Sequence, residues 1–442
     1  MRPTVVLLLA LVASVPAAAE PIELSAGFAA VPLPIPEGGA MAGYGGLRNR
    51  TATGVLDPPE ARALVLDGNG LRVAIVALDV LIARPRLRND LQARVVGLDV
   101  DSLILVATHT HSGPGGYEPG WLAGRVTGAS HEPGAAERLA SAATLAVEIA
   151  VGQLSPARVA VDLASVELAE NRRYEDGPKE TALPLLRVDF SDGSDPAVLF
   201  AFAAHPIVLS NRSRDYSADY VGAARERLSL AGWRPIFIPG PLGDQQPTSL
   251  LGPLWPDELE LQREQAREIG GRLADAVLAG VAELESAAPS TFRVAERWVD
   301  VPDSGMRRFC PLWWFSPLVR RGLSRYLSPQ VPFVAVQLDD ALLLALPAEP
   351  ASSVGNALRA EASEGNVPFV VAHANDWMGY AVSPEEYARG GYEACMSFFG
   401  PGFGPWLVDE AVRTAERVRP GGGVGRPPGA AGGTEPIAAE RR

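Results

Sequence analysis

Apolar and polar residues along the chain follow two kinds of pattern. Continuous apolar runs of about four to eight residues are typical of buried strands, and apolar residues that recur every three or four positions are typical of helices. Two apolar runs flank the turn sequence Asp67-Gly68-Asn69-Gly70, which predicts a β-hairpin. Strands are expected at residues 61–66, 71–78, 103–107, 157–168, 183–190, 198–204, 235–238, at two places within 333–346, and at 367–371. Helices are expected at residues 133–154, 218–231, 257–284, 351–362 and 403–417.

The order of these elements predicts the fold class. Strands and helices alternate without a sequence repeat, which favours an α/β fold with a mixed sheet and flanking helices. No linker-like stretch interrupts residues 24–419, so residues 20–419 are expected to form a single large domain. Residues 420–442 are rich in glycine, proline, alanine and charge, and are expected to be a disordered tail.

The first residues have the three parts of a secretory signal peptide. Arg2 supplies the positive region, residues 5–12 the apolar region, and Ala17-Ala18-Ala19 a small-residue cleavage site. The alternative, a membrane anchor, is disfavoured because the apolar run is too short to span a bilayer. Residues 1–19 are therefore expected to be removed, and the mature protein to be secreted or periplasmic.

Net charge limits the classes of partner that are expected, and the two cysteines bear on whether the chain contains a disulfide. The formal net charge of −13 over 442 residues makes nucleic acid an unexpected partner, because an acidic protein repels phosphate. The two cysteines, Cys310 and Cys395, are expected to form one disulfide in an exported protein. Two buried free thiols are the alternative.

His109, His111 and His205 each follow a predicted buried strand. His109 and His111 lie in THTHSGPGGY, directly after the strand at 103–107. If that strand continued, side chains two residues apart would point to the same face and both imidazoles would converge at its end. His205 follows another apolar run in FAAHPIVLSNR. Loop histidines without a role are the alternative, but together they suggest a zinc site that needs an acidic or phenolic partner, which composition does not identify.

A larger set of segments occurs in a characteristic order. The set comprises THTHSGPGGY at 108–117, His205-Pro206 followed by Asn211 and Asp219, GDQQP at 243–247, LPAEP at 346–350, ANDWMGYAVSPEEY at 374–387 and GYE at 391–393. In this order the chain resembles the N-terminal catalytic domain of the neutral ceramidases, over residues 28–410.

The resemblance implies a function and a site. Its zinc ligands would be His109, His205, Glu349 and Tyr380, with Zn²⁺ as the cofactor. His111 and Arg172 would contact the reacting group and stabilise the oxyanion, and His111 could pass a proton to the leaving amine. The implied reaction is hydrolysis of the N-acyl amide bond of ceramide or a related lipid amide by zinc-bound water.

The chain departs from the family at a catalytic position. Gln246 stands where the family has a serine that is regarded as catalytic or substrate-contacting. A glutamine amide can hydrogen-bond but cannot act as a nucleophile. A covalent serine mechanism is therefore not expected, whereas attack by zinc-bound water remains possible.

Two further features concern the residues after the catalytic domain and one segment within it. Only the glycine- and proline-rich residues 420–442 follow the catalytic domain, so the family's C-terminal β-sandwich is expected to be missing from this chain. Residues 306–327 combine tryptophan, phenylalanine and leucine with several arginines, a composition suited to peripheral contact with a membrane interface. A lid or core segment is the alternative interpretation of residues 306–327.

Three other functions compete with ceramide hydrolysis. The first is a zinc hydrolase that acts on a different amide or ester, which Gln246 favours. The second is a lipid-binding homologue that has lost catalysis, which the intact set of zinc ligands disfavours. The third is a structural zinc site, but such sites are usually closed by cysteine and histidine.

Overall fold

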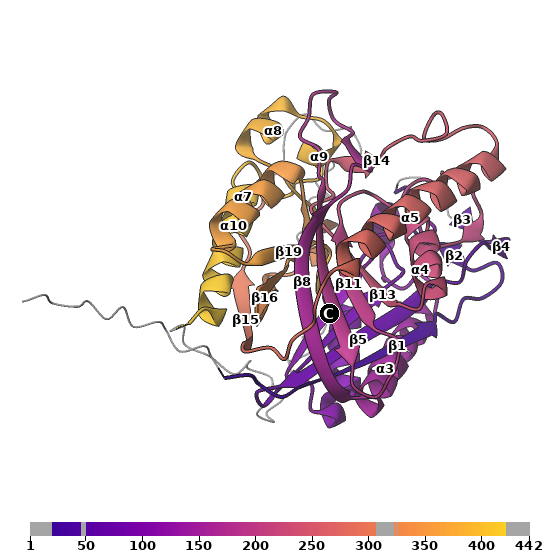
Figure 1. Ribbon diagram of the computed structural model, residues 1–442. Coiled ribbons are helices and arrows are strands. Elements are labelled where there is room, and N and C mark those ends of the chain that lie inside the picture. The colour runs from indigo at the N-terminus through magenta and orange to yellow at the C-terminus, as the bar shows by residue number, and fades with distance from the viewer. Residues whose placement is uncertain (1–19, 46–49, 306–321, 324, 421–442) are drawn as a thin grey trace, which may run out of the picture.

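Two sheets form the centre of the molecule. The computed structural model describes residues 20–45, 50–305, 322–323 and 325–420 (Figure 1). The larger sheet has eight strands in the order β13-β11-β10-β8-β1-β5-β6-β7. Its strands are β1 (Leu24–Pro32), β5 (Glu60–Gly68), β6 (Leu71–Leu78), β7 (Ser102–Ala107), β8 (Ser155–Ser165), β10 (Ala182–Phe190), β11 (Ala197–Phe202) and β13 (Arg234–Pro239). The smaller sheet has the order β15-β16-β17-β19, with β15 (Phe292–Asp300), β16 (Gln330–Leu338), β17 (Ala341–Ala345) and β19 (Val367–Val371).

Both sheets are mixed. The pairs β6–β7, β11–β13 and β17–β19 are parallel, and the other neighbours in these two sheets are antiparallel. The helices are α1 (Pro85–Arg94), α2 (Trp121–Thr127), α3 (Ala135–Gly152), α4 (Tyr220–Leu230), α5 (Leu259–Ala282), α7 (Ser352–Ala362), α8 (Pro384–Arg389), α9 (Tyr392–Cys395) and α10 (Phe403–Ala415), with short 3₁₀ turns at Val96–Leu98 and Glu416–Val418. The predicted mixed α/β fold with flanking helices is confirmed.

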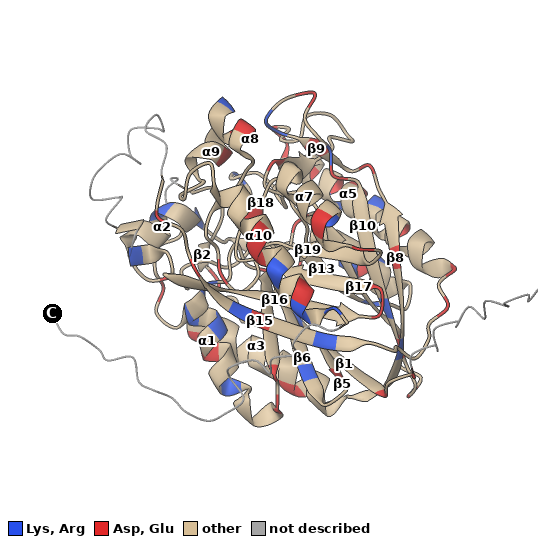
Figure 2. Cartoon of the chain, turned by 90° about the vertical axis from the view of Figure 1, so that its left-hand side faces the viewer, with Lys and Arg blue, Asp and Glu red and all other residues tan. Residues whose placement is uncertain are grey.

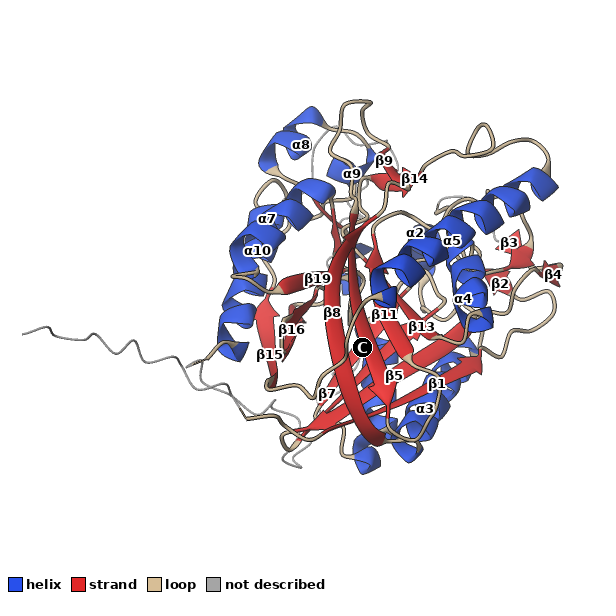
Figure 3. Cartoon of the chain, in the orientation of Figure 1, coloured by secondary structure: helices blue, strands red, loops and turns tan. Residues whose placement is uncertain are grey.

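The elements stack in four layers. Apolar side chains of both sheets share one core, so the sheets pack face to face. Helices α1 and α3 cover the outer face of β1 and β5 to β7, and α4 and α5 cover β10, β11 and β13. Helices α7 and α10 lie on the other outer side, against the smaller sheet (Figure 3). Strands covered on both faces appear in the sequence as continuous apolar runs.

The continuous apolar sequence of strand β5 contributes side chains to two hydrophobic cores, one on each face of the sheet. Leu64 and Leu66 belong to the core between the sheets, whereas Ala63 and Val65 belong to the core under α1 and α3. The predicted hairpin is confirmed: β5 pairs with β6 as far as Gly68 and Leu71. Its turn residues Asn69 and Gly70 have φ values of 52° and 72°, a conformation that asparagine and glycine adopt readily.

Strands β1 and β15 and helix α1 were not predicted. The sequence of β1, LSAGFAAVP, is rich in alanine and glycine and carries little strand preference. Packing explains these small residues, because a Cβ atom on Gly27 would lie 1.9 Å from the carbonyl oxygen of Ala150 in α3. Close approach of the helix to the sheet thus selects glycine where strand propensity would not.

Short two-stranded pairings hold the loops at one end of the sheets. Their strands are β2 (Ala40–Met41), β3 (Arg50–Thr51), β4 (Gly54–Val55), β9 (Ala169–Asn171), β12 (Asp215–Tyr216), β14 (Gln245–Pro247), β18 (Glu349–Pro350) and β20 (Tyr380–Ala381). The pairs are β2–β3, β4–β12, β9–β14 and β18–β20. The pairs β4–β12, β9–β14 and β18–β20 connect segments that are far apart in the sequence, so loop residues obtain fixed positions.

The outer surface of the helices is polar. Charged residues of both signs lie close together on α1 and α10 (Figure 2), for example Arg94 with Asp90 at 3.0 Å and Arg413 with Glu410 at 2.6 Å. None of the helices in the described part of the chain is long and apolar enough to cross a membrane.

Several predictions fall on residues outside the described ranges. These are the signal peptide at 1–19, the tail from 421 onward, and residues 306–321 and 324 of the segment 306–327. Cys395 is disulfide-bonded, and Cys310, its expected partner, lies outside the described ranges.

Helix α8 begins with a capping box that can be tested by mutation. The Ser383 hydroxyl accepts from the Glu386 amide at 3.2 Å, and the Glu386 carboxylate accepts from the Ser383 amide at 3.1 Å. Ser383→Ala removes one of these bonds, and we expect it to lower the free energy of unfolding by about 1 kcal/mol in urea denaturation. Ser383→Thr retains the hydroxyl and is expected to behave like the wild type. Equal stability of the alanine and threonine variants would contradict the capping role.

Candidate metal centre

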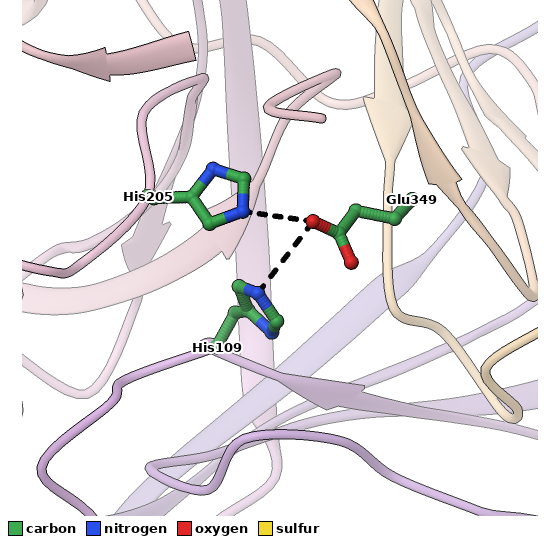
Figure 4. A group of neighbouring side chains, drawn as sticks. All are labelled: His109, His205 and Glu349. Atoms are coloured by element: carbon green, nitrogen blue, oxygen red, sulfur yellow. Dashed lines mark hydrogen bonds and ion pairs between the residues drawn. The ribbon is translucent and has the colours of Figure 1, made fainter. Parts of the chain in front are cut away.

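Polar side chains from both sheets meet at the carboxyl ends of four strands. His109 follows β7, His205 follows β11, Glu349 lies four residues after β17, and His373 follows β19. In open α/β sheets this edge is where ligand sites form. The ligand atoms of His109, His205 and Glu349 lie within 4.8 Å of one another, and all three side chains are buried (Figure 4). The structure therefore brings together three of the four predicted zinc ligands as a group that could bind a metal ion.

The two histidines of the HTH segment are close for a reason other than the one expected. Strand β7 ends at Ala107, and His109 has a φ of +67°, so the strand does not continue through the segment. The backbone instead turns, with the His109 amide donating to the Val80 carbonyl at 3.1 Å. The ring centroids of His109 and His111 nevertheless lie 4.9 Å apart, and their Nε2 atoms 3.4 Å apart. The expected convergence is present, but a left-handed backbone conformation produces it.

Backbone carbonyls fix the orientation of both candidate histidine ligands. His109 Nδ1 lies 2.7 Å from the Leu81 oxygen, and His205 Nδ1 lies 2.9 Å from the Gln245 oxygen. A carbonyl oxygen only accepts hydrogen bonds, so both rings donate from Nδ1, and in the neutral ring Nε2 carries a free lone pair. This arrangement is common among histidines that bind metals, because the outer hydrogen bond sets the ring plane and the tautomer.

The three ligand atoms lie close to one another. His205 Nε2 lies 2.8 Å and His109 Nε2 lies 3.7 Å from Glu349 Oε1. Burial lowers the pKa of His205 to about 4, with a further contribution from Arg172, and burial lowers the pKa of His109 as well. Burial alone would raise the pKa of Glu349, but His109 and His205 hold it well below its usual value. Two neutral imidazoles and one carboxylate would repel each other through their lone pairs, so their chemistry fits a bound divalent cation.

Tyr380 lies beside this group. The strands β18 and β20 pair in parallel, with Glu349 opposite Tyr380. The Tyr380 hydroxyl lies 3.3 Å from His205 Nε2 and accepts from Arg172 Nη2 at 3.0 Å. Burial, followed by the charge of Glu349, raises the pKa of Tyr380 well above its usual value. The fourth predicted ligand is thus adjacent to the other three as a neutral phenol.

Arg172 is oriented by three acceptors. Its Nε donates to Glu393 Oε1 at 2.9 Å, and its Nη2 donates to the Gly243 carbonyl at 3.0 Å as well as to Tyr380. The ion pair with Glu393 is largely shielded from solvent. The guanidinium is consequently a fixed positive charge next to the candidate metal ligands.

A cavity of about 300 Å³ opens onto these groups. Its polar lining comprises His109, His111, Arg172, Glu349, Tyr44, Tyr380 and Tyr392. Its remaining lining is mainly apolar: Leu81, Ile82, Val126, Ile207, Trp255, Trp377 and Met396, with Gly45. A mostly apolar cavity with a few converging polar groups is typical of a small-molecule site.

Gln246 does not lie with the other predicted site residues. Its side-chain amide donates to Glu170 Oε1 at 2.8 Å across the β9–β14 pair, and it is not among the residues that line the cavity. Its neighbour Gln245 contributes instead, through the main-chain oxygen that holds His205.

This placement predicts a small effect of mutating Gln246. Gln246→Ala removes one hydrogen bond, which is worth roughly 0.5–1.5 kcal/mol, so hydrolysis should fall by less than about tenfold. Steady-state turnover of the variant, compared with the wild type at equal metal content, measures this effect. A loss of several hundredfold would mean that Gln246 contacts the reacting group.

Three residues of the site were not identified from the sequence. Trp377 Nε1 donates to Glu349 Oε2 at 3.1 Å, Glu393 pairs with Arg172, and the buried His373 ring stacks on His109 with centroids 4.0 Å apart. A signal existed for His373, because it follows a predicted apolar strand just as His109 and His205 do. For Trp377 and Glu393 the sequence offered only the family segments that contain them.

Comparisons with known proteins identify relatives of this chain and a shared fold. Residues 34–229 match the family model described as "Neutral/alkaline non-lysosomal ceramidase, N-terminal". A neutral ceramidase of Mycobacterium tuberculosis is 27% identical over 253 residues, which cover 49% of this chain and 39% of that protein. The crystal structure of neutral ceramidase from Pseudomonas aeruginosa superposes with a TM-score of 0.75 at 20% identity, over 91% of this chain and 76% of that one. A ceramidase complexed with C2 superposes with a TM-score of 0.74 at 19% identity, over 89% and 75% of the two chains.

The aligned part of the chain thus spans less than half the length of the Mycobacterium tuberculosis relative, whereas the fold is shared over most of the chain. The predicted resemblance to the neutral ceramidases is confirmed: residues 34–229 match the model of their N-terminal region, and most of the chain shares the fold of a neutral ceramidase.

Proposed function

We propose that this protein is a zinc-dependent amidohydrolase that cleaves the N-acyl amide bond of ceramide or a related lipid amide. The observation that carries the proposal is the convergence of His109 Nε2, His205 Nε2 and Glu349 Oε1 within 4.8 Å at the wall of a mainly apolar cavity. The match to the ceramidase family model supports a hydrolase, and the cavity lining supports a substrate with an apolar chain.

Zinc is the ion that this donor set favours. Imidazole nitrogen and carboxylate oxygen are usual zinc ligands, and a catalytic zinc keeps one position open. The residues that would hold it are His109, His205, Glu349 and Tyr380. When bound, zinc polarises a carbonyl and lowers the pKa of a water ligand to about 7.

His111 has the protonation state required of a hydrogen-bond donor to substrate. The Tyr44 amide donates to His111 Nδ1 at 3.4 Å, so a neutral ring carries its proton on Nε2. Burial holds the pKa of His111 well below its usual value, with His109 and His205 adding to the effect, so the ring is neutral at pH 7. From the cavity wall, Nε2–H is available to donate a hydrogen bond to a developing oxyanion.

Arg172 provides the complementary charge. Its guanidinium lines the same cavity and is held by Glu393 and the Gly243 carbonyl, so it does not have to reorganise when negative charge develops on a substrate oxygen. Arg172 and His111 together are the proposed oxyanion partners. Gln246 has no part in this mechanism.

The test is a comparison of substrates with a single product assay. Zinc-loaded protein is incubated with ceramide, another N-acyl amide and a fatty acyl ester, and released fatty acid is quantified. Release from ceramide that is lost in His205→Ala supports the proposal. Release from the ester or from the other amide alone would favour the alternative zinc hydrolase. Binding of ceramide without release from any substrate would favour a lipid-binding protein.

Export and membrane contact stay predictions. The signal peptide predicts a mature N-terminus near Glu20, which N-terminal sequencing of exported protein checks. Peripheral contact through residues 306–327 predicts cosedimentation with lipid vesicles that weakens when the tryptophans of that segment are replaced.

A further inference from the structure

His373 is a buried histidine whose two ring nitrogens have no hydrogen-bond partner among the described residues. It lies two residues after the end of β19, and its side chain is 0% exposed. Buried polar groups are nearly always hydrogen-bonded, so an unsatisfied one in a native fold requires an explanation. A leucine of similar size would fill the space without that penalty.

The backbone holds this ring in a defined place. The His373 amide donates to the Ala348 carbonyl at 3.1 Å, and the His373 carbonyl accepts from the Ala107 amide at 3.2 Å. Its φ of +54° is a left-handed conformation that is uncommon among residues other than glycine. The segment before Glu349 and the strand before His109 therefore both bond to His373.

The ring lies against two of the three candidate ligands. It is nearly parallel to the His109 ring, with an interplanar angle of 18° and centroids 4.0 Å apart. Its Nε2 lies 3.7 Å from Glu349 Oε2, the oxygen that accepts from Trp377 Nε1. The other oxygen, Oε1, is the one that reaches His205 and His109. His373 thus touches the ligand group without belonging to the set whose atoms lie within 4.8 Å of one another.

We propose that His373 is a positioning residue of the metal centre. Its ring packs flat on His109, which Leu81 already holds through Nδ1, and its Nε2 lies beside Glu349 Oε2, so that its removal would leave both ligand side chains free to shift. Groups that orient ligands in this way typically change metal affinity about 10–100-fold when they are removed. The inference rests on the metal site of the proposed function and not on the identity of the substrate.

This role predicts two effects of opposite sign. Without metal, His373→Leu removes an unsatisfied buried polar group, so the apo protein should melt at the same temperature or higher. With metal, the same change should weaken binding, because Glu349 and His109 lose their orientation. A residue that merely packs would shift apo stability and metal affinity in the same direction.

The experiment measures zinc affinity by competition with a chromophoric chelator, together with melting temperatures of the apo and zinc-loaded full-length protein. We expect His373→Leu to bind zinc about 10–100-fold more weakly than the wild type, with apo melting not lowered. His373→Gln, whose longer amide can place an N–H near the Nε2 position, should recover most of the affinity. His131→Leu is the matched control and should leave it unchanged, because His131 contacts the Gly116 carbonyl outside the cavity.

Wild-type zinc affinity in His373→Leu would overturn the inference. If the leucine variant does not fold, His373→Asn takes its place in the experiment, because the shorter asparagine amide cannot reach the Nε2 position. Equal zinc affinities of the asparagine and glutamine variants would then overturn the inference. Absence of zinc binding by the wild type would overturn the proposed metal centre together with this role. Intact zinc binding without ceramide turnover would overturn only the proposed substrate.

Discussion

Replacing Glu349 with alanine is expected to reduce bound zinc from about one equivalent per chain to near zero and to lower hydrolysis by about a thousandfold or more. Glu349 carries the negative charge among the candidate ligands, and its Oε1 is the atom closest to His205 Nε2. Loss of a catalytic metal removes several kcal/mol of transition-state stabilisation, and about 4 kcal/mol corresponds to a thousandfold in rate. Metal analysis and steady-state kinetics on the same preparation measure both effects.

Glu180→Ala provides a matched control for the loss of a buried glutamate. Glu180 is 3% exposed and pairs with Arg359, but it does not line the cavity. Its replacement should affect stability and leave zinc content unchanged. His205→Ala should reproduce the metal loss of Glu349→Ala, because it removes another member of the same group. Full activity in Glu349→Ala would show that this cluster is not the catalytic site.

The ends of the strands could be predicted from the sequence, whereas most contacts between the site residues could not. His109 and His205 were found because apolar runs that stop abruptly at a histidine indicate the carboxyl end of a buried strand. The two histidines lie close together as expected, although β7 does not extend as far as His109. Strand ends are local features, so hydrophobic pattern is sufficient to identify them.

Glu349 and Tyr380 depend on contacts that local pattern does not contain. The pairing of β18 with β20 places them side by side across about thirty intervening residues, and each strand has only two residues. Among many carboxylates and tyrosines, only the resemblance to a family selected these two. The role of Arg172 depends likewise on Glu393, which is distant in sequence and 2.9 Å away in the fold.

The placement of Gln246 shows the limit of transferring roles by alignment. The resemblance placed it at a catalytic position, whereas its side chain bonds to Glu170 on the neighbouring strand and does not line the cavity. Side chains alternate along a strand, so a position that contacts substrate in one protein can face away after a small local change. The segment GDQQP still contributes to the site through the main chain of Gly243 and Gln245.

Replacing Arg172 with lysine is expected to lower kcat by about 10²–10³-fold while zinc content stays at the wild-type level. The guanidinium bonds to Glu393 through Nε and to Tyr380 and the Gly243 carbonyl through Nη2. A lysine ammonium is a single point and cannot occupy both ends of this arrangement, so its charge would be displaced from the position that faces the substrate oxygen. Metal analysis alongside single-turnover kinetics separates this effect from loss of the ion.

Arg173 offers a control within the same segment. Its Nη2 donates to the Glu386 and Gly390 carbonyls, its Nε lies 3.6 Å from Glu393 Oε2, and it does not line the cavity. Arg173→Lys removes the same type of side chain one residue away, so we expect its kcat to stay within about tenfold of the wild type, the effect of losing a hydrogen bond remote from the reacting atoms. Comparable losses in both variants would indicate that the Arg172-Arg173 segment acts by stabilising the fold. A large loss confined to Arg172→Lys, with zinc retained, is the result expected if Arg172 faces the developing oxyanion.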